Sequence, residues 1–547
     1  MKKKIIISLI FFYTLSVNHL FSQVEHIVVQ HPVYQFLEYA YTKGILENFS
    51  LSTLPLQRKE IQEALKVIRL NDSSLSETDK KTLSLFEKEF ELSYRQNATI
   101  FFSKSDTNQL LFSRIFTDDE KYIYRYSDSS SSVSLIPLGS IENINKINNK
   151  NEFDKVFLGN LGFRLYGTID NSLGYGLQVT NGVVLAGTRN LAIEESKITR
   201  NIKFVLLNSD FDFSESHIRY SKDWFHFIFS RETRLIGSGL RQRLIISDNA
   251  PPMDGISLGA KFSNFEYRYS HFKLIGQPDS NVPVGAFTKI PPKYFVLQKF
   301  TLKPSWGDIS YFHSIVYSGR ELEFAYLNPL SFLKSIEHSL RDRDKTTMGF
   351  DFNINPFRNV QISGTWMLED IIISKIGTGF WSNKTAWNIA LKYSLPFSAD
   401  IGLEYTRIEP YMFTHFNVQN NRTNDGYLFG TYLYPNSDET SLQFRWFWGN
   451  RYPLIFAIIY QRHGNNIYDN NGNLVRNVGG DPFYVRLPKD SETVTFLDGD
   501  RSNSLSFSIN AGFELFRGFN LQCYYLLRIT NDSPENIFKI YFRFADF

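Results

Sequence analysis

The feature that most constrains the fold is a two-residue periodicity that recurs from about Ser93 to the end of the chain. Trp387, Ile389, Leu391 and Tyr393 alternate with smaller or more polar side chains. Successive side chains of a β-strand point to opposite faces, so each such segment predicts a strand with one apolar and one polar face. The same pattern occurs at 442–448, 505–515 and 519–529.

The last eleven residues, 537–547, show the pattern most clearly. The apolar side chains share one parity: Phe538, Ile540, Phe542 and Phe544. The polar side chains take the other: Lys539, Tyr541 and Arg543. About nine to eleven residues is the length of a tilted strand that crosses a membrane. A free edge this apolar would invite aggregation unless closure of a barrel paired it.

A chain that ends on an aromatic residue, as this one does at Phe547, resembles bacterial outer-membrane barrels, in which the barrel assembly machinery reads this end. Phe547 is, however, out of phase with the apolar parity of the strand. From these residues alone, the last strand of a soluble β-protein is the alternative.

Composition supports amphipathic strands rather than one dry core. The chain has 50 Phe, 30 Tyr and 7 Trp, yet its mean hydropathy is only -0.25, which suits strands with aromatic girdles. The net charge is +3, and no basic helix or arm stands out, so we expect no nucleic-acid partner. The single cysteine, Cys523, excludes an intrachain disulfide framework.

The N-terminus predicts export. Lys2 to Lys4 form a positive region, and Ile5 to Val17 form an apolar run of about thirteen residues, the length of a secretory signal and too short to span a membrane. Ser22 suits the residue before the cut. We therefore expect a cleaved signal peptide over residues 1–22 and a mature protein in the outer membrane.

Residues 23–92 predict a small periplasmic helical bundle. Apolar residues at helical spacing predict helices near 33–41 and 61–68. Ser76 with Asp79 three residues later predicts the start of a third helix. Residues 93–547 would form the barrel. The fold class is thus an all-β transmembrane β-barrel of about 16–18 antiparallel strands with a small N-terminal α-helical bundle.

Three polar stretches predict solvated loops. They are 127–132, the Asn- and Lys-rich run 143–151, and 464–501. In outer-membrane barrels the longer loops face outward, so these stretches are candidates for the extracellular side.

Several stretches are similar, in order and spacing, to the capsule assembly Wzi family. The first, 229–252, runs from a strand through Gly237-Ser-Gly239 to a turn ending in Ser, Asn, Ala and Pro. The others are 315–329, 401–415, 434–438 (with Tyr434 where Gly is expected), and 39–44 with 56–60 in the helical part. These stretches are spread along the chain, and the likeness covers nearly the whole mature chain.

The resemblance implies an outer-membrane barrel of about eighteen strands with a helical bundle at its periplasmic end. It implies a lectin-like protein that helps attach or assemble capsular polysaccharide, neither a catalyst nor an exporter. The expected partners are a capsular or exopolysaccharide, outer-membrane lipid and the barrel assembly machinery, and we expect a monomer. The resemblance implies no cofactor, no metal and no catalytic residue.

A surface that holds an acidic polysaccharide needs hydrogen-bond donors, guanidinium groups and flat aromatic faces. The candidate polysaccharide-binding residues are Arg231, Glu232, Arg234, Arg241, Arg243, Arg341, Asp342, Arg343, Asp344, Glu404, Arg407, Glu409 and His415. Arg241 and Arg243 share a parity and would point the same way if that segment is extended. The alternative for each residue is packing, because Arg and Glu ladders also fill barrel lumens.

Enzymatic functions fit less well. The 10 His are scattered and form neither a Ser-centred elbow nor a metal-binding pair. One cysteine and dispersed histidines are too few for a metal site. The leading hypothesis is a non-enzymatic polysaccharide-binding barrel. The alternatives are an outer-membrane channel for uptake of small molecules or oligosaccharides and, less favoured, a barrel hydrolase.

Overall fold

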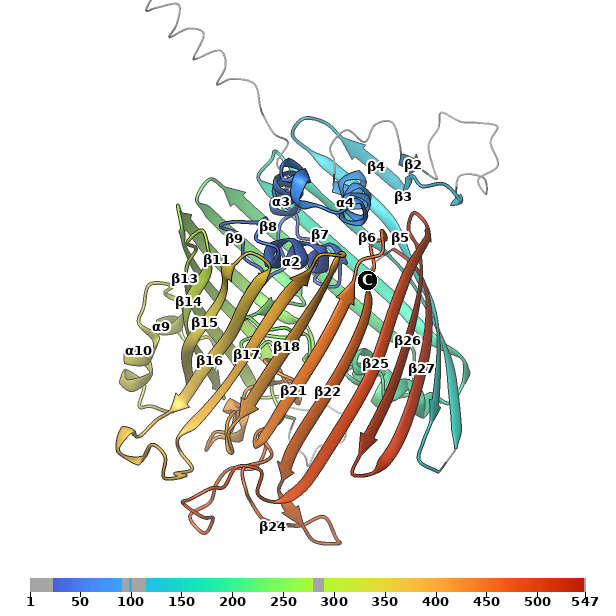
Figure 1. Cartoon of the computed structure of the whole chain (residues 1–547). Helices are drawn as coiled ribbons and strands as arrows, with labels where there is room; N and C mark the ends of the chain where they lie inside the picture. The colour runs from blue at the N-terminus through green and yellow to red at the C-terminus, as the bar shows by residue number, and fades with distance from the viewer. Residues whose placement is uncertain (1–22, 91–97, 101–114, 151, 279–289, 546–547) are drawn as a thin grey trace, which may run out of the picture.

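A closed antiparallel barrel of 18 strands forms the body of this computed structural model (Figure 1). The structure describes residues 23–90, 98–100, 115–150, 152–278 and 290–545. The strands of the wall are β5 (Ser132–Ile147), β6 (Phe153–Ile169), β7 (Leu173–Gly187), β8 (Phe211–Lys222), β9 (Phe225–Glu232), β11 (Met253–Phe262), β12 (Phe265–Ile275), β13 (Pro292–Leu302), β14 (Gly307–Ser318), β15 (Lys345–Phe357), β16 (Val360–Asp370), β17 (Lys384–Leu395), β18 (Ala399–Ile408), β21 (Ser437–Trp446), β22 (Leu454–Asn465), β25 (Asp500–Phe516), β26 (Phe519–Thr530) and β27 (Ser533–Phe544). The predicted fold class is confirmed.

Shorter helices and strands are not part of the barrel wall. The helices are α2 (Val33–Thr42), α3 (Arg58–Leu70), α4 (Glu77–Phe90), α6 (Arg189–Ile193), α7 (Ser196–Thr199), α8 (Ile202–Leu207), α9 (Phe324–Leu327) and α10 (Leu333–Ser339). The short strands are β1 (Thr53–Leu54), β2 (Ala98–Ile100), β3 (Glu120–Tyr122), β4 (Tyr124–Ser127), β10 (Leu235–Ile236), β19 (Thr423–Asn424), β20 (Tyr427–Leu428), β23 (Ile467–Tyr468) and β24 (Leu474–Arg476). No helix in the described ranges is long and apolar enough to cross a membrane.

The last strand closes the barrel on the first long one. β27 pairs antiparallel with β5, in a register that runs from Asn536 opposite Ile147 to Phe544 opposite Gly139. The short strand β4 pairs with the beginning of the same edge of β5, from Tyr124 opposite Leu135 onward. The edge left open beyond β27 is thus covered by β4, which limits the unpaired backbone that could recruit another chain.

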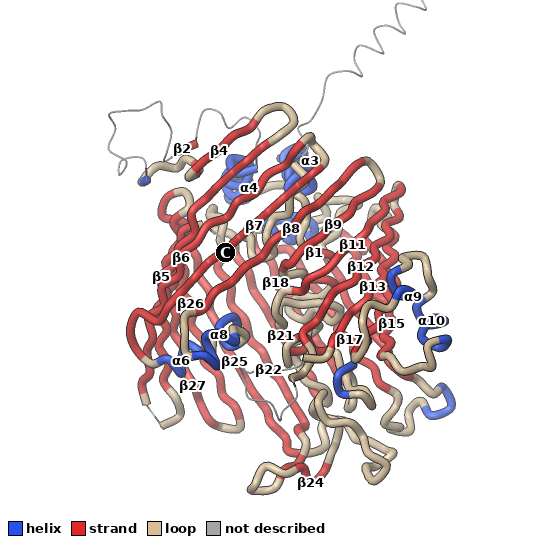
Figure 2. Tube along the Cα trace, turned by 180° about the vertical axis from the view of Figure 1, so that it is seen from behind, coloured by secondary structure: helices blue, strands red, loops and turns tan. Residues whose placement is uncertain are grey.

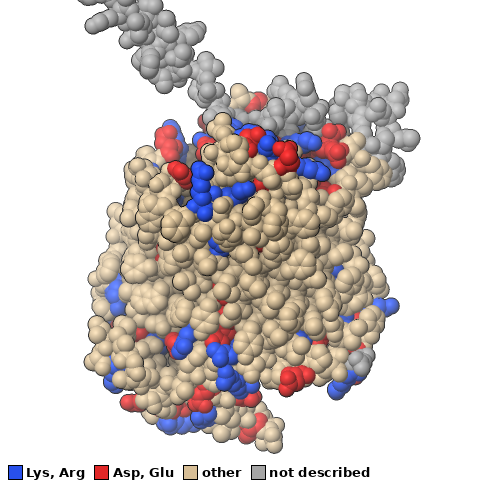
Figure 3. Space-filling model, in the orientation of Figure 1, with Lys and Arg blue, Asp and Glu red and all other residues tan. Residues whose placement is uncertain are grey.

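The wall has an apolar outside and a polar inside. On β17, the outward side chains of Ile389, Leu391 and Tyr393 are 47%, 50% and 45% exposed, whereas the inward Lys392 and Ser394 are buried. In the view of Figure 3, charged residues gather mainly toward the two ends of the molecule and leave a largely uncharged belt between them. Such a belt matches the apolar band of an outer-membrane barrel.

Connections of different lengths define the two mouths of the barrel. Tight turns such as 170–172, 223–224, 263–264 and 517–518 join strands at one end, here called the short-turn mouth. Long connections join strands at the opposite end, here called the long-loop mouth (Figure 2). They include 188–210, 233–252, 319–344, 371–383, 409–436 and 466–499.

Two of the three predicted loops need correction. Most of the run 143–151 is not a loop, since β5 continues to Ile147. Ile144 is fully buried against α6–α8, which lie inside the long-loop mouth. The stretch 127–132 is a turn, as predicted, but it is the tight hairpin between β4 and β5 at the short-turn mouth and not one of the longer loops. The long connection within 464–501 is confirmed, because β22 ends at Asn465 and β25 begins at Asp500.

Three N-terminal helices form a bundle in the short-turn mouth, as predicted. The third helix begins with reciprocal capping: the Ser76 hydroxyl accepts from the Asp79 amide, and the Asp79 carboxylate accepts from the Ser76 amide, both at 3.0 Å. The bundle has its own apolar core, which also includes Phe447 from the turn between β21 and β22. The rings of Phe36 and Phe447 lie 5.8 Å apart.

Buried ion pairs anchor the bundle to the wall. Glu38 of α2 contacts Lys392 Nζ at 2.7 Å and the Arg445 guanidinium at 3.0 Å, and Arg445 also reaches Asp400. The Tyr41 hydroxyl donates to the carbonyl of Asn353 at 3.0 Å. Because a buried charge is stable only when it is paired, these contacts fix the bundle in one position.

Several predictions fall on residues outside the described ranges. The signal peptide occupies residues 1–22, and the terminal Phe547 lies in 546–547. The boundary at residue 92 lies in 91–97. The division into signal peptide, helical bundle and barrel domains therefore stays a prediction.

Protonating Glu38 should loosen the bundle. Burial alone would raise the pKa of Glu38, but Lys392 and Arg445 outweigh burial and lower it from 4.5 to about 2. A carboxylate with a depressed pKa stabilises the folded state above its unfolded pKa and loses that effect as the pH falls through the folded pKa. We therefore expect the hydrogen-exchange protection of α2, corrected for intrinsic rates, to fall between pH 4.5 and about 2.

Two variants make this test specific. Glu38→Gln should lower the local opening free energy of α2 at neutral pH by about 3 kcal/mol, the order expected when one partner of a buried pair is removed, and abolish most of the acid dependence. Glu63→Gln, on the exposed face of α3, is the matched control and should behave like the parent. Equal acid dependence in Glu38→Gln and the parent would contradict the assignment.

Candidate functional site

Loops that fold inward fill one half of the lumen. The connections 233–252 and 409–436 pack with the inner faces of β12–β18 around one apolar cluster. Its members include Leu244, Ile245 and Ile246 from the first loop and Met412, Phe413 and Phe429 from the second. This side of the barrel has a packed core, not an open pore.

Buried polar side chains lock the Gly237-Ser-Gly239 loop in place. The Ser238 amide donates to Asp351 at 2.6 Å, and the Gln242 amide donates to Glu404 at 3.0 Å. The side chain of Asn388 donates to the carbonyls of Ser238 and Gln242. A Cβ at Gly239 would clash with Gln242, Asn388 and Glu404, so only glycine fits there.

The other half of the lumen encloses a cavity of about 550 Å³, here called the lumen cavity. The wall strands β5–β8 and β25–β27 line it on one side, and the inward segments 195–201 and 248–252 line it on the other. It lies inside the long-loop mouth and extends toward Gln30 of the N-terminal segment.

Two basic residues of the last strand are paired with acids that line the same cavity. Lys539 contacts Glu195 at 2.6 Å, and Arg543 contacts Glu142 at 3.2 Å. Among the described residues, neither Lys197 nor Arg200 has an ion-pair partner, and neither do the lining acids Asp212, Glu215 and Asp248; the side chain of Lys197 is accessible in the cavity. Loss of contact with water lowers the pKa of Lys197 most, and the positive charge of Arg543 lowers it further. The cavity thus disfavours the charged form of Lys197, and an incoming anion would stabilise that form.

Aromatic and guanidinium groups lie beside Lys197. Arg200 donates to the carbonyl of Asp248. The hydroxyl of Tyr432 donates to the Asp248 carboxylate. Tyr524 and Tyr541 present further rings from the polar face of the last two strands. Flat rings next to polar groups are the kind of surface on which sugar rings pack.

Some predicted site residues border this cavity. Arg231 lines it and pairs with Asp254 at 2.9 Å. The guanidinium of Arg241 pairs with Glu439 at 2.9 Å and lies 5.8 Å from the ring of Tyr432, which also lines the cavity. The segment of Arg241 and Arg243 is not a strand. Arg243 instead donates to the carbonyl oxygens of Gly237 and Leu51, so the two side chains serve different partners.

Other predicted residues lie apart from the cavity. Glu404 is buried under the glycine loop, and Arg407 pairs with Glu409 at 2.7 Å. Within the described part of the chain, the hydrogen bonds of the His415 side chain stay in its own turn, with Asn417. Arg341, Asp342 and Arg343 are exposed in the connection 319–344, and Asp344 is buried beside Arg320. The structure does not gather the thirteen candidates into one site.

Sequence reasoning missed four residues that line the cavity. They are Lys197, Arg200, Tyr432 and Tyr524. Tyr541 and Arg543 were identified only as members of the polar face of the last strand. Alternation of apolar and polar side chains along the last strand was the one feature of the sequence that could have identified them, because the polar face of a barrel strand points into the lumen.

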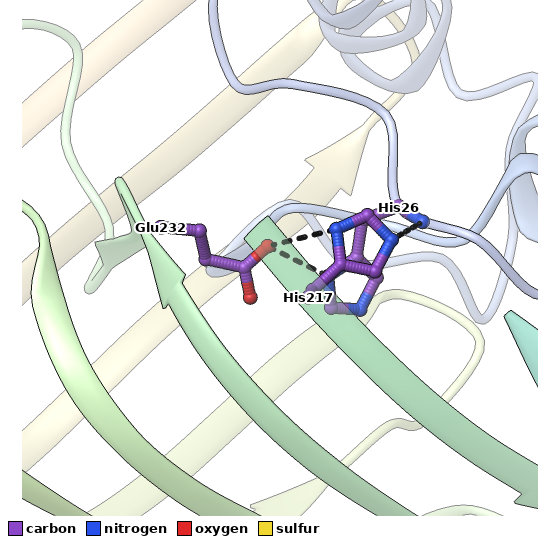
Figure 4. Close-up of side chains that lie close together, drawn as sticks. All are labelled: His26, His217 and Glu232. Atoms are coloured by element: carbon purple, nitrogen blue, oxygen red, sulfur yellow. Dashed lines mark hydrogen bonds and ion pairs between the residues drawn. The ribbon is translucent and has the colours of Figure 1, made fainter. Parts of the chain in front are cut away.

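Glu232 belongs to a buried cluster with His26 and His217 beside the lumen cavity (Figure 4), and Arg234 pairs with its carboxylate at 2.8 Å. Ligand atoms of His26, His217 and Glu232 lie within 4.8 Å of one another. Arg219 lies 3.0 Å from Nε2 of His26, and Glu232 lies 2.9 Å from Nδ1. A guanidinium only donates, so Nε2 accepts and Nδ1 carries the proton that it donates to Glu232.

The hydrogen bonds of this cluster disfavour a metal ion. With Nδ1 protonated, His26 has no lone pair left to face Glu232. Nε2 of His217 is likewise occupied, because it accepts from the His26 amide at 3.0 Å. Arg219 and Arg234 add positive charge. The arrangement fits a hydrogen-bonded clamp that fastens the N-terminal segment to β8 and β9.

Comparison with known proteins supports the fold. No protein-family model and no curated protein sequence matches the chain. OprD and OccK8 (OprE) of Pseudomonas aeruginosa share 10% and 9% identity, cover 75% of this chain and 94% and 98% of their own, and superpose with TM-scores of 0.41 and 0.42. These two similarities are weak.

A more extensive structural similarity is to Wzi of Escherichia coli, described as an outer-membrane protein involved in group 1 capsule assembly and as a carbohydrate-binding β-barrel. The match covers 95% of this chain and 100% of that chain, at 13% identity and a TM-score of 0.57. The chain therefore has the fold of Wzi, an outer-membrane β-barrel, and the resemblance inferred from the sequence is confirmed at the level of the fold.

Proposed function

We propose that this protein is a non-enzymatic outer-membrane lectin that binds an acidic polysaccharide in the lumen cavity and helps attach or assemble it at the cell surface. The observation that carries the proposal is the cavity itself. Its volume of about 550 Å³ falls within the roughly 300–1,000 Å³ of small-molecule sites. It combines tyrosine rings with an unpaired lysine, a lining suited to part of a charged sugar chain.

The orientation of the barrel supports access from outside the cell. In outer-membrane barrels the short turns face the periplasm and the longer loops face outward. The short-turn mouth would then be periplasmic, and the helical bundle in it blocks that end with buried ion pairs. The lumen cavity would be reached from the long-loop mouth, where a surface polysaccharide is present.

The charges of the cavity favour an acidic sugar. Binding a carboxylate would neutralise Lys197 without breaking the existing pairs of Lys539 and Arg543. Guanidinium and ammonium groups bind carboxylates through charge-assisted hydrogen bonds, which are roughly twice as strong as neutral ones. A neutral sugar would leave only the carboxylates of Glu142, Glu215 and Asp248 to stabilise the charge of Lys197.

Among the sequence candidates, Arg231 and Arg241 fit this function best, because Arg231 lines the cavity and Arg241 lies near the ring of Tyr432, which lines it. Buried Glu232, Arg234, Asp344 and Glu404 are better suited to holding the protein together, since a ligand would have to displace their partners. Removing one partner of a buried pair leaves an uncompensated charge.

Replacing the free lysine should weaken binding of acidic glycans. For Lys197→Ala we expect roughly tenfold weaker binding, since a hydrogen bond to a charged group contributes about 1.5–3 kcal/mol. The measurement is calorimetric titration of the detergent-solubilised protein with extracted surface polysaccharide and with polygalacturonate, using neutral dextran for comparison. Arg241→Ala should weaken binding too, and Arg243→Ala, which removes contacts to backbone carbonyls, should change it less.

The matched control is Lys489→Ala, in the exposed part of the connection 466–499. It should bind like the parent. If the parent binds neither the extract nor polygalacturonate, the lectin proposal is wrong. If Lys197→Ala binds as well as the parent, the cavity is not the site.

A channel function makes the opposite electrical prediction. Because the inward loops and the bundle occlude the lumen, we expect near silence in single-channel recordings with a planar bilayer. Glu38→Gln, which loosens the bundle, should raise the frequency of brief openings, whereas Glu63→Gln should not. A large and steady current through the parent protein would favour uptake of small molecules or oligosaccharides instead.

A further inference from the structure

The connection between β14 and β15 lies on the outside of the barrel, not in its lumen. Residues 319–344, here called the outer flap, leave the wall at the long-loop mouth and return to it there. Its helices α9 and α10 lie beside β13–β15, outside the wall and about halfway along the barrel (Figure 1). They pack on an apolar cluster of outward-facing wall residues.

The wall beneath the outer flap is unusually polar. On β13, Phe295 and Leu297 face the packed core of the lumen, so the alternate side chain of Gln298 faces outward. On β14, His313 and Tyr317 share the outward parity. All three outward residues are buried. Groups this polar would be costly against lipid, and the outer flap removes them from it.

The same wall residues satisfy the backbone of the outer flap. The Tyr269 hydroxyl donates to the carbonyl of Tyr326 at 2.6 Å. The Gln298 amide donates to the carbonyls of Pro329 and Ser331, both at 2.9 Å. Non-helical backbone at membrane depth is tolerated only where protein supplies its hydrogen bonds. The wall supplies them here.

The apex of the outer flap lies deep along the wall. Phe332 packs on His313, with ring centroids 5.8 Å apart. His313 lies opposite Gln298 and well before Ser318, the end of β14 at the long-loop mouth. At about 3.3 Å per residue, the apex is roughly 16 Å along the strand from that end. His313 is thus near the middle of β14, and the middle of a membrane-spanning strand lies within the hydrocarbon core, which is about 30 Å thick.

The side of the outer flap that faces away from the wall is apolar. Phe324, Leu330 and Phe332 are 83%, 87% and 61% exposed. They continue the exposed apolar surface of the neighbouring strands, at Phe300 and Phe350. Exposed to water, such a patch would cost solvation free energy, whereas among acyl chains it would not.

Basic side chains lie where the outer flap rejoins the rim. Arg341 and Arg343 are exposed, and within the described ranges neither guanidinium has an ion-pair partner. They directly precede β15, at the level where the wall meets the long-loop mouth. Nearby, Arg320 and Tyr326 bind Asp344 at 2.9 Å and 2.8 Å and hold the base of the outer flap on the barrel.

We propose that the outer flap is seated in the outer leaflet of the membrane. Phe324, Leu330 and Phe332 contact acyl chains, and Arg341 and Arg343 bind the phosphate groups of lipid headgroups, for which the guanidinium fork is well suited. This inference is independent of polysaccharide binding. It assigns Arg341 and Arg343 to lipid rather than to the polysaccharide for which the sequence had suggested them.

Depth-dependent quenching tests the seating of the apex. In a Cys523→Ser background, Leu330→Cys is labelled with an environment-sensitive fluorophore in vesicles of phosphatidylcholine and phosphatidylglycerol. We expect blue-shifted emission, strong quenching by lipids brominated on the acyl chain and little quenching by aqueous iodide. Phe350→Cys on the wall is the positive control, and Asn471→Cys in an exposed turn is the aqueous control.

Two results would overturn the acyl-chain contact. Iodide quenching equal to that of Asn471→Cys would mean that the apex lies in water. Protection from both quenchers, together with cross-linked dimers, would mean that a second copy of the chain covers it. Both results differ from a failure of glycan binding, because neither readout involves a sugar.

Retention of lipid tests the headgroup contact. Phosphatidylglycerol molecules that stay bound after delipidation are counted by native mass spectrometry. The double variant Arg341→Gln and Arg343→Gln should lose retained lipid relative to the parent, and Lys489→Gln should not. Unchanged retention in the double variant would show that the two arginines do not bind lipid phosphate.

Discussion

Backbone hydrogen bonds between β27 and β5 join the end of the chain to its first long strand, and the other features of the structure depend on this closure. Without it, the wall would present an apolar, aromatic edge of a dozen residues to water. With it, each strand can turn one face to lipid and the other to an enclosed lumen. The lumen then becomes a compartment in which polar groups must find partners inside the protein.

Buried carboxylates on the inner wall organise what fills that compartment. Glu404 and Asp351 accept the amides of the glycine loop, and Glu38 bridges α2 to Lys392 and Arg445. Lys299 extends the same network, reaching Asp351 at 3.1 Å and the Ser52 hydroxyl at 2.9 Å. One half of the lumen is packed as a result, and the other half keeps the cavity in which we propose that an acidic sugar binds.

On the outer surface too, polar groups are kept away from lipid, and one region of the wall needs a separate cover to achieve this. Most outward side chains are apolar, but Gln298, His313 and the tyrosines of β12–β14 are not. The outer flap compensates locally: it covers these side chains, accepts hydrogen bonds from Gln298 and Tyr269, and presents Phe324 and Leu330 outward. The polar patch on the wall is thus covered by the outer flap, and the apolar residues of the flap take the place of that patch on the outer surface.

The strands, the faces they present and one helix start could be predicted from local patterns in the sequence. Alternation fixed the strands and their faces, and the Ser76–Asp79 cap fixed the start of α4, because both depend on neighbours within a few residues. Partners in space were decided only by the tertiary structure. The loop that carries Arg241 folds into the lumen, where Arg241 pairs with Glu439. The outer flap folds to the outside of the barrel, so Arg341 does not lie in the lumen. Tertiary packing also buried Ile144 in a stretch whose polarity had predicted a loop, because α6–α8 fold back to cover it. Loop paths are chosen by long-range packing and hydrogen bonding, which leave no periodic trace in the sequence.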